Sequence, residues 1–182
     1  MENENLVTDF KRKSHILNTY FAKQCPLFEI ESSLPGFTAN TLNNFTSFEF
    51  ACDDIVSIIA KMNPKKAHGW DNISVSLVKL CSNEIAVPLK LIFSKCLEVG
   101  IFPSKWKYAN VQPVHKKDSR QLVSNYRPIS LLPIFGKIFE KIMFDSMYSF
   151  FQANQLITRN QSGFRPGDST INQLLSITTE IC

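Results

Sequence analysis

The sequence predicts an α+β fold that is mostly helical and contains one basic β-hairpin. Apolar residues recur with helical spacing along much of the chain, and two short β-rich segments flank a polar link at 115–125. The 182 residues are 44% hydrophobic and include 15 Phe, which is enough to bury a core. This length fits one large domain or two small ones, and we expect a helical lead-in at 1–49 and a main domain at 50–182.

The first half of the chain is predicted to be helical around one linker. Helices are expected at 6–24, at 51–62, at 74–82 and at 85–99. Residues 25–48 contain Pro, Gly and many small polar residues, which indicates a linker. Asp53 and Asp54 favour the start of the second helix, and Ser74 can cap the third. Pro88 is expected in the first turn of the fourth helix and Gly100 just past its end. The core face of that helix is expected to hold Leu89, Ile92, Phe93, Cys96 and Leu97.

The second half is predicted to open with the hairpin. Its strands are expected at 108–114 and 126–132. Pro113 and Pro128 cannot donate ladder hydrogen bonds, so both strands should be edge strands or pair irregularly. A long helix is expected to begin at Pro133 and to end near Ala153. A turn-rich loop at 158–167 and a last helix from Asp168 or Ser169 complete the chain.

The positive charge is concentrated near the hairpin. The whole chain carries a net charge of +4, but residues 105–127 hold six Lys or Arg residues against Asp118 alone. These cations lie beside Trp106, Tyr108 and Tyr126, a combination that favours a polyanionic partner. On the charge alone a solvated lysine-rich loop is the favoured interpretation, since such runs are common on protein surfaces.

Several protein classes are disfavoured by composition. No apolar run reaches the roughly 18 residues that a membrane span needs. The N-terminus is polar and resembles neither a signal peptide nor a lipidation site. The five Cys residues are an odd number without a Cys-x-x-Cys pair, which disfavours a disulfide framework and a zinc ribbon. We therefore expect an intracellular protein, in the cytoplasm or nucleus, that does not bind membranes.

Asp53 and Asp54 match the sequence pattern of a magnesium site but are not expected to form one. The sequence around Asp53 and Asp54 has the apolar-x-Asp-Asp-apolar pattern that holds magnesium in polymerases. That pattern works on a tight β-hairpin, whereas this pair is expected in the first turn of a helix. We predict no metal site and no catalytic residue in this chain. Phosphate-binding glycine loops of the Gly-x-x-x-x-Gly-Lys and Gly-x-Gly-x-x-Gly types are also missing from the sequence.

Four motifs occur in a recognisable order. They are Lys65-Lys-x-x-Gly-x-Asp71, then Pro103…Trp106…Pro113-Val-His-Lys-Lys117, then Asn125-Tyr-Arg-Pro-Ile-Ser-Leu-Leu132, and finally Gly163-Phe-Arg-Pro-Gly-x-Ser-Thr170. In this order and spacing the chain resembles the reverse transcriptases of non-LTR, LINE-type retrotransposons of the jockey or CR1 kind. The resemblance covers about residues 50–182, and more loosely the helical lead-in from about residue 6.

The resemblance implies the fingers and the start of the palm of a right-hand polymerase. In such an enzyme the basic hairpin folds over the incoming nucleotide, so Arg127 and one of Lys116 or Lys117 would grip the triphosphate. Lys137, Lys141 and Arg165 would contact the template. For each of these residues a surface ion pair or a solvated side chain is the plainer alternative.

Three further matched residues are expected to shape turns. Gly69 is expected to supply a positive φ and Asp71 to cap the following helix. Asn72 stands where the family often has Gly, and Asn also tolerates left-handed angles. Gly163 would lie in a turn close to the template or the palm.

The resemblance places the catalytic aspartates beyond Cys182. Two-metal chemistry needs carboxylates that hold both ions. We therefore expect a fragment without cofactor that is inactive alone, whereas the complete enzyme would use Mg²⁺ and dNTPs. Its partners would be an RNA template, a DNA primer and the missing palm and thumb.

Two other interpretations remain open from the sequence. The chain could be a non-catalytic nucleic-acid-binding module, because the basic stretch could bind any phosphate backbone. It could also be a poorly folding retroelement remnant, since the apolar faces of the last two helices would lack the palm.

Overall fold

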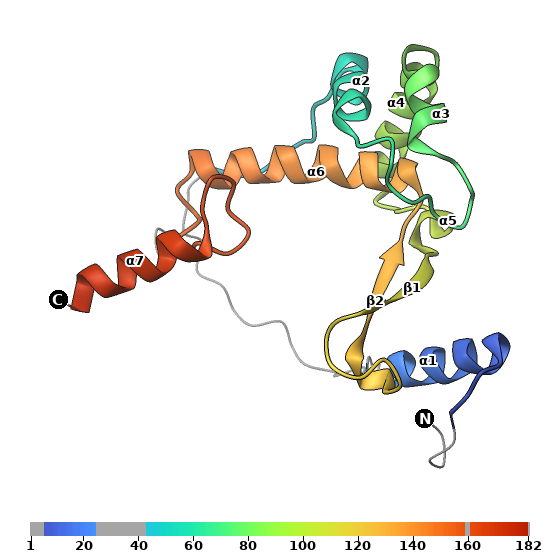
Figure 1. Ribbon diagram of the computed structural model, residues 1–182. Coiled ribbons are helices and arrows are strands. Elements are labelled where there is room, and N and C mark those ends of the chain that lie inside the picture. Colours follow the sequence, from blue (N-terminus) through green and yellow to red (C-terminus); the bar gives the residue numbers. More distant parts are fainter. Residues whose placement is uncertain (1–5, 25–42, 159–160, 182) are drawn as a thin grey trace, which may run out of the picture. The chain divides into compact units, whose positions relative to one another are not determined.

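The computed structural model describes residues 6–24, 43–158 and 161–181, and these residues form an α+β fold that is mostly helical (Figure 1). Within these ranges there are seven α-helices, one short 3₁₀ helix and one two-stranded antiparallel sheet. The chain divides into two compact units. The first contains Met1–Pro35 and Phe50–Ile142, and the second contains Gly36–Glu49 and Met143–Cys182. The expected division at residue 49 stays a prediction, and most of the expected linker lies outside the described residues.

The four helices predicted in the first unit are confirmed with small shifts in their ends. They are α1 (Phe10–Gln24), α2 (Cys52–Lys61), α3 (Val75–Leu80) and α4 (Ser82–Val99). A short fifth helix, α5 (Ser104–Lys107), was not predicted. Asp53 and Asp54 lie in the first turn of α2. Ser74 caps α3 by accepting a hydrogen bond from the Leu77 N–H at 3.2 Å. Gly100 ends α4 with a left-handed φ of 67°.

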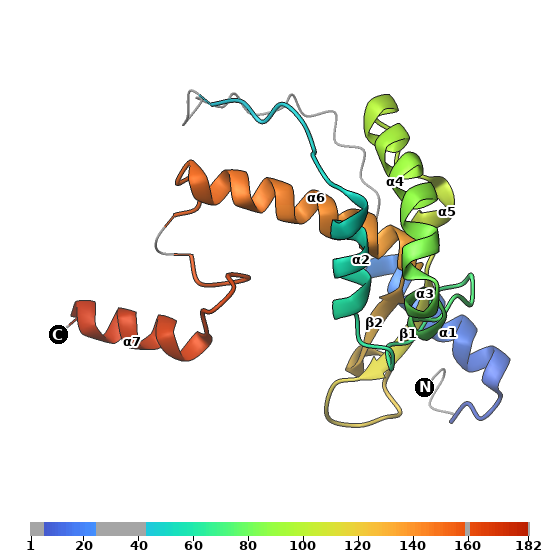
Figure 2. The same cartoon turned by 90° about the horizontal axis from the view of Figure 1, so that it is seen from above.

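Two details of α4 differ from the prediction. The helix begins at Ser82 rather than Ile85, so Pro88 lies inside it instead of in its first turn. The predicted core face is correct for Leu89 and Phe93, which are buried, but Ile92 is 46% exposed and Ala86 is buried instead. The buried face of α4 is therefore rotated from the predicted one. The helix packs against α2 (Figure 2).

The core of the first unit lies between α2, α3, α4 and the first half of α6 (Ile134–Ala153). Phe93 is fully buried and stacks on Phe139 with ring centroids 4.9 Å apart. The other buried hydrophobic side chains are Ile55, Ile59, Val75, Val78, Ala86, Leu89, Ile134, Ile138 and Ile142. Full burial of a Val, Leu, Ile or Phe side chain contributes about 1.5–3 kcal/mol to folding. This core fixes the turns and the hairpin that are attached to it.

The hairpin consists of β1 (Asn110–His115) and β2 (Tyr126–Leu131), joined by a link that contains the 3₁₀ helix η1 (Val123–Asn125). Pro113 and Pro128 are direct partners in the register. Because the described sheet has only these two strands, each is an edge strand, as the prolines predicted. The strand β2 leads through Leu132 and Pro133 into α6.

The second unit contains the rest of α6 and α7 (Thr170–Ile181). Phe45 packs edge-on against Phe48 and Phe150, with centroid distances of 4.8 and 5.4 Å. Several large apolar side chains of α7 are exposed: Ile171, Leu174, Leu175 and Ile177. No described helix in either unit is both long and apolar enough to span a membrane.

Candidate nucleotide and nucleic-acid interface

The hairpin places two of the predicted phosphate-binding residues on one face. Arg127 is the register partner of Val114, and the Lys116 N–H donates to the Asn125 carbonyl at 2.8 Å, which continues the ladder by one step. Because side chains alternate along a strand, Lys116 lies on the same side as Val114 and diagonally from Arg127. Lys117 follows in a bend. The described geometry therefore groups these three cations at the end of the hairpin.

The three cations are available to a ligand. The side chains of Lys116, Lys117 and Arg127 are exposed. They form no hydrogen bond or ion pair within the described ranges 6–24, 43–158 and 161–181. This geometry removes the ion-pair alternative for Arg127 among the described residues. Unpaired cations in this arrangement can accept an anion without first breaking an internal contact.

The link between the strands is folded back on itself. The Tyr126 hydroxyl donates to the Arg120 carbonyl at 2.9 Å, and the Asn125 side-chain amide donates to the Ser119 carbonyl at 2.8 Å. Tyr126 also meets the His115 ring edge-on at 5.4 Å. These contacts span several residues and have no local sequence signal, so they could not be predicted from the sequence. They give the basic link a defined shape.

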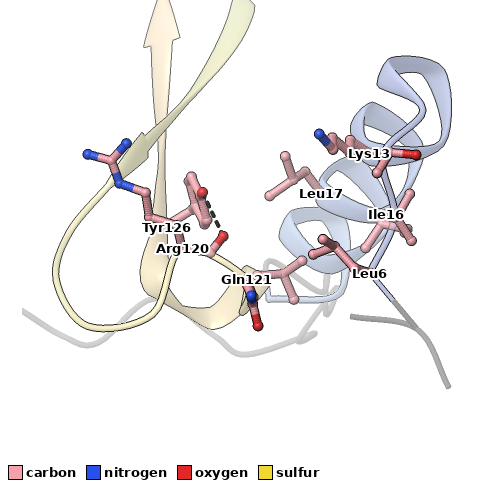
Figure 3. A pocket seen from close by; sticks show the side chains of 10 residues that line it. Leu6, Lys13, Ile16, Leu17, Arg120, Gln121 and Tyr126 are labelled. Atoms are coloured by element: carbon pink, nitrogen blue, oxygen red, sulfur yellow. Dashed lines mark hydrogen bonds between the residues drawn. The ribbon is translucent and has the colours of Figure 1, made fainter. Parts of the chain in front are cut away.

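A hollow of about 470 Å³ lies beside this link, between it and α1 (Figure 3). Leu17 of α1 points toward Tyr126, while the Arg120 guanidinium points away from α1. The residues that line the hollow are Leu6, Val7, Thr8, Lys13, Ile16, Leu17, Arg120, Gln121, Val123 and Tyr126. The helix α1 thus supports the side of the link that faces away from Arg127, because Tyr126 and Arg127 point to opposite faces.

Gly69 serves a different purpose from the one expected. Its φ is not positive; Asn72 takes the left-handed angle instead, with φ of 58°. Gly69 is buried, and a Cβ at this position would lie 2.6 Å from the Pro133 nitrogen and 2.8 Å from the Leu132 carbonyl carbon. The turn therefore crosses directly over the junction of β2 and α6, where only glycine fits.

Asp71 likewise does not cap the helix as expected. Its carboxylate accepts a hydrogen bond from the Ile73 N–H at 3.3 Å, which closes a turn of two residues. The capping role belongs to Ser74. Both residues hold the loop between α2 and α3 in shape.

The remaining predicted residues lie on α6 and in the second unit. Lys137 is half-buried and Lys141 is exposed, one helical turn apart in the first half of α6. In the second unit the Arg165 guanidinium donates to the Gln161 carbonyl at 3.5 Å. The pKa of the Asp168 carboxyl is lowered, chiefly by a hydrogen bond from Ser162 and in smaller part by the charge of Arg165. Arg165 is thus partly engaged within its own loop.

Gly163 lies in this same loop. A Cβ at Gly163 would have open space, and its φ is not positive. The neighbouring Phe164 takes the left-handed angle, with φ of 62°, and is fully exposed. The described geometry gives no packing reason for glycine at 163.

Comparison with known proteins identifies the relatives of this chain. No family model matches it. It is 35% identical to the RNA-directed DNA polymerase from mobile element jockey of Drosophila melanogaster over 123 residues. It is 31% identical over 130 residues to the probable RNA-directed DNA polymerases from transposon X-element and from transposon BS of the same species. The chain is related to the RNA-directed DNA polymerases of non-LTR retrotransposons.

The matches to these polymerases cover 67 to 71% of this chain but only 13 to 14% of each relative. The chain thus corresponds to a small part of a retrotransposon polymerase. The name polymerase applies to each whole relative. The role of the matched part must therefore be argued from the residues of this chain.

The residues that the structure describes do not fit the magnesium ions of a polymerase. Asp54 uses its carboxylate to accept the Ala51 N–H at 2.7 Å, which stabilises the start of α2. Among the residues that the structure describes, no group of three or more His, Cys, Asp or Glu side chains is placed to hold a metal ion. In this chain Asp53 and Asp54 therefore belong to the first turn of α2 and not to a metal site among the described residues.

Proposed function

We propose that this chain is the nucleotide- and template-gripping part of the reverse transcriptase of a non-LTR retrotransposon, corresponding to fingers and early palm. One observation carries the proposal: the exposed cations Lys116, Lys117 and Arg127 gather at the end of the hairpin without a counter-ion in the described chain. The similarity to retrotransposon RNA-directed DNA polymerases supports it.

The chemistry of the three cations suits a triphosphate. Arg127 offers a planar fork of donors that can bind two phosphate oxygens at once, while Lys116 and Lys117 act as point charges. Pro128 follows Arg127 and fixes the backbone φ of the strand that presents it. The Lys116 side chain lies on the same face as Arg127, so one triphosphate can contact both.

Binding of a deoxynucleoside triphosphate tests this assignment. We expect Arg127→Ala to weaken dNTP binding by the full chain about tenfold or more, because a hydrogen bond to a charged group contributes roughly 1.5–3 kcal/mol. Calorimetric titration with the dNTP and with the matching nucleoside measures this effect. The nucleoside, which lacks phosphate, should bind equally to both proteins.

A matched control removes a cation elsewhere. Lys95 lies on α4 and pairs with Glu98 at 2.9 Å, so Lys95→Ala changes the net charge equally but should leave dNTP affinity unchanged. Equal affinity of Arg127→Ala and Lys95→Ala would contradict the proposal. Loss of RNA binding with unchanged dNTP binding in Arg127→Ala would favour the second candidate, a non-catalytic nucleic-acid-binding module, which the basic stretch at 105–127 also supports.

Polymerisation itself is expected to need more than these residues. Catalysis by two metal ions requires carboxylates that hold both ions, and the matched positions supply none. We therefore expect a protein made of these 182 residues to extend no DNA primer on an RNA template with Mg²⁺ and dNTPs. Extension above the level of the Arg127→Ala variant, followed on a sequencing gel, would contradict this expectation. RNA template, DNA primer and the palm and thumb remain its proposed partners.

A further inference from the structure

A second basic surface in the first unit carries two exposed aromatic rings. It is formed by α5 and Tyr108 together with the loop around Trp70. Trp106 turns inward from α5 and packs against Phe93, Phe102 and Phe139, with ring centroids 5.7 to 6.0 Å apart. Because Trp106 anchors α5 in the core, the neighbouring Lys105, Lys107 and Tyr108 are left exposed to solvent.

Trp70 joins this surface through three contacts. Its ring nitrogen donates to the Lys105 carbonyl at 2.9 Å. The Lys105 ammonium lies over the Trp70 ring, 5.5 Å from its centroid. The Tyr108 ring meets Trp70 edge-on at 6.0 Å. The two rings are therefore held in place, yet Trp70 stays 37% exposed and Tyr108 57% exposed.

The charge around these rings is positive. The loop at 65–71 and the segment at 104–108 contain four lysines, Lys65, Lys66, Lys105 and Lys107, against Asp71 alone. The Asp71 carboxylate is already used by the Ile73 N–H. Apart from the contact of Lys105 with Trp70, the four ammonium groups form no hydrogen bond or ion pair in the part of the chain that the structure describes.

We propose that Trp70, Tyr108 and the flanking lysines form a stacking platform for single-stranded nucleic acid. Exposed aromatic rings bind bases of any sequence by stacking, and lysines beside them bind the connecting phosphates. Tyr108 offers the more exposed ring for a base, Trp70 supports it edge-on, and Lys107 lies next to it in the sequence to meet a phosphate. Paired bases inside a duplex cannot reach the rings, so the platform selects single strands. The platform is separate from the hairpin cations and does not depend on their binding a triphosphate.

The test uses the full chain and a fluorescein-labelled single-stranded RNA about ten nucleotides long, followed by fluorescence anisotropy. Tyr108→Ala is expected to weaken binding about tenfold, the effect of losing one stacked base. Tyr108→Phe keeps the ring and should bind as the unchanged chain does. Tyr108→Leu keeps the apolar contact with Trp70 but offers no aromatic face, so it should behave like Tyr108→Ala.

An abasic oligomer with the same number of phosphates isolates the stacking contribution. The Tyr108→Ala variant and the unchanged chain should bind this oligomer equally, and the dNTP affinity of the variant should also be unchanged. The proposal is overturned if Tyr108→Ala binds the RNA with full affinity, if it loses abasic binding to the same extent, or if duplex RNA binds as tightly as the single strand. Single-stranded DNA of the same sequence should bind comparably, because stacking does not involve the 2′-hydroxyl.

Discussion

Gly69 lies where the chain passes closest to its own backbone. Three backbone atoms of Leu132 and Pro133 would lie within 2.9 Å of a Cβ at this position. Both neighbours belong to the junction between β2 and α6, so neither can move without disturbing the hairpin or the buried start of α6. Because Gly69 has no side chain, the loop after α2 can pack directly against the backbone at the base of the hairpin.

We expect Gly69→Ala to lower the free energy of unfolding by about 1–3 kcal/mol, because an added methyl in a packed site forces backbone shifts. Urea denaturation followed by circular dichroism measures this change. Gly163→Ala is a matched control, since a Cβ there meets no atom within 4 Å and should change stability by less than about 0.5 kcal/mol. Equal stabilities of the two variants would contradict the close approach at Gly69.

The sequence identified the need for glycine at 69 but not its reason. A local pattern can indicate a turn, whereas the approach of a segment more than 60 residues away leaves no local trace. Asn72 has the positive φ instead, although the sequence had indicated only that Asn tolerates a left-handed angle at this position. The same limit applies to Trp70: its contacts with Lys105 and Tyr108 come from a distant segment, and no motif marks them.

At the scale of the element, local signals were sufficient to find most helices and both strands. The apolar spacing from Ala51 to Met62 predicted α2 to within one residue at each end. Ser74 and Gly100 marked helix ends because their roles depend only on neighbouring backbone atoms. The start of α4 was placed too late because Pro88 was taken as a first-turn residue.

The face that an element buries was less predictable than its extent. In α4 both Ile92 and Phe93 are strongly apolar, but Phe93 is fully buried against Phe139 and Trp106, whereas Ile92 is 46% exposed. The choice depends on where α2 and α6 lie, which is a tertiary property. In the hairpin only the family resemblance predicted that Arg127 and one of Lys116 or Lys117 act together, because the register that pairs Arg127 with Val114 could not be read from the sequence.

At the scale of the whole molecule, burial is uneven between the two units. All the buried hydrophobic side chains named above lie between Ile55 and Ile142, in the first unit. The described side chains of the second unit are half-buried or exposed. Stability against local opening follows buried apolar contact, so the two units should differ in how readily their hydrogen bonds open.

Amide hydrogen exchange should therefore separate the two units. We expect the amides of α2, α4 and the segment from Ile134 to Ile142 to exchange at least about tenfold more slowly than those of α7, because opening these helices exposes the core formed around Phe93. Mass spectrometry of peptides after timed deuterium labelling measures the rates, and the urea-unfolded chain supplies the reference for each peptide. Protection of α7 equal to that of α4 would contradict the uneven burial. Exchange at the unfolded rate throughout, including α2 and α4, would instead show a poorly folding remnant, because a formed core cannot leave its own amides unprotected.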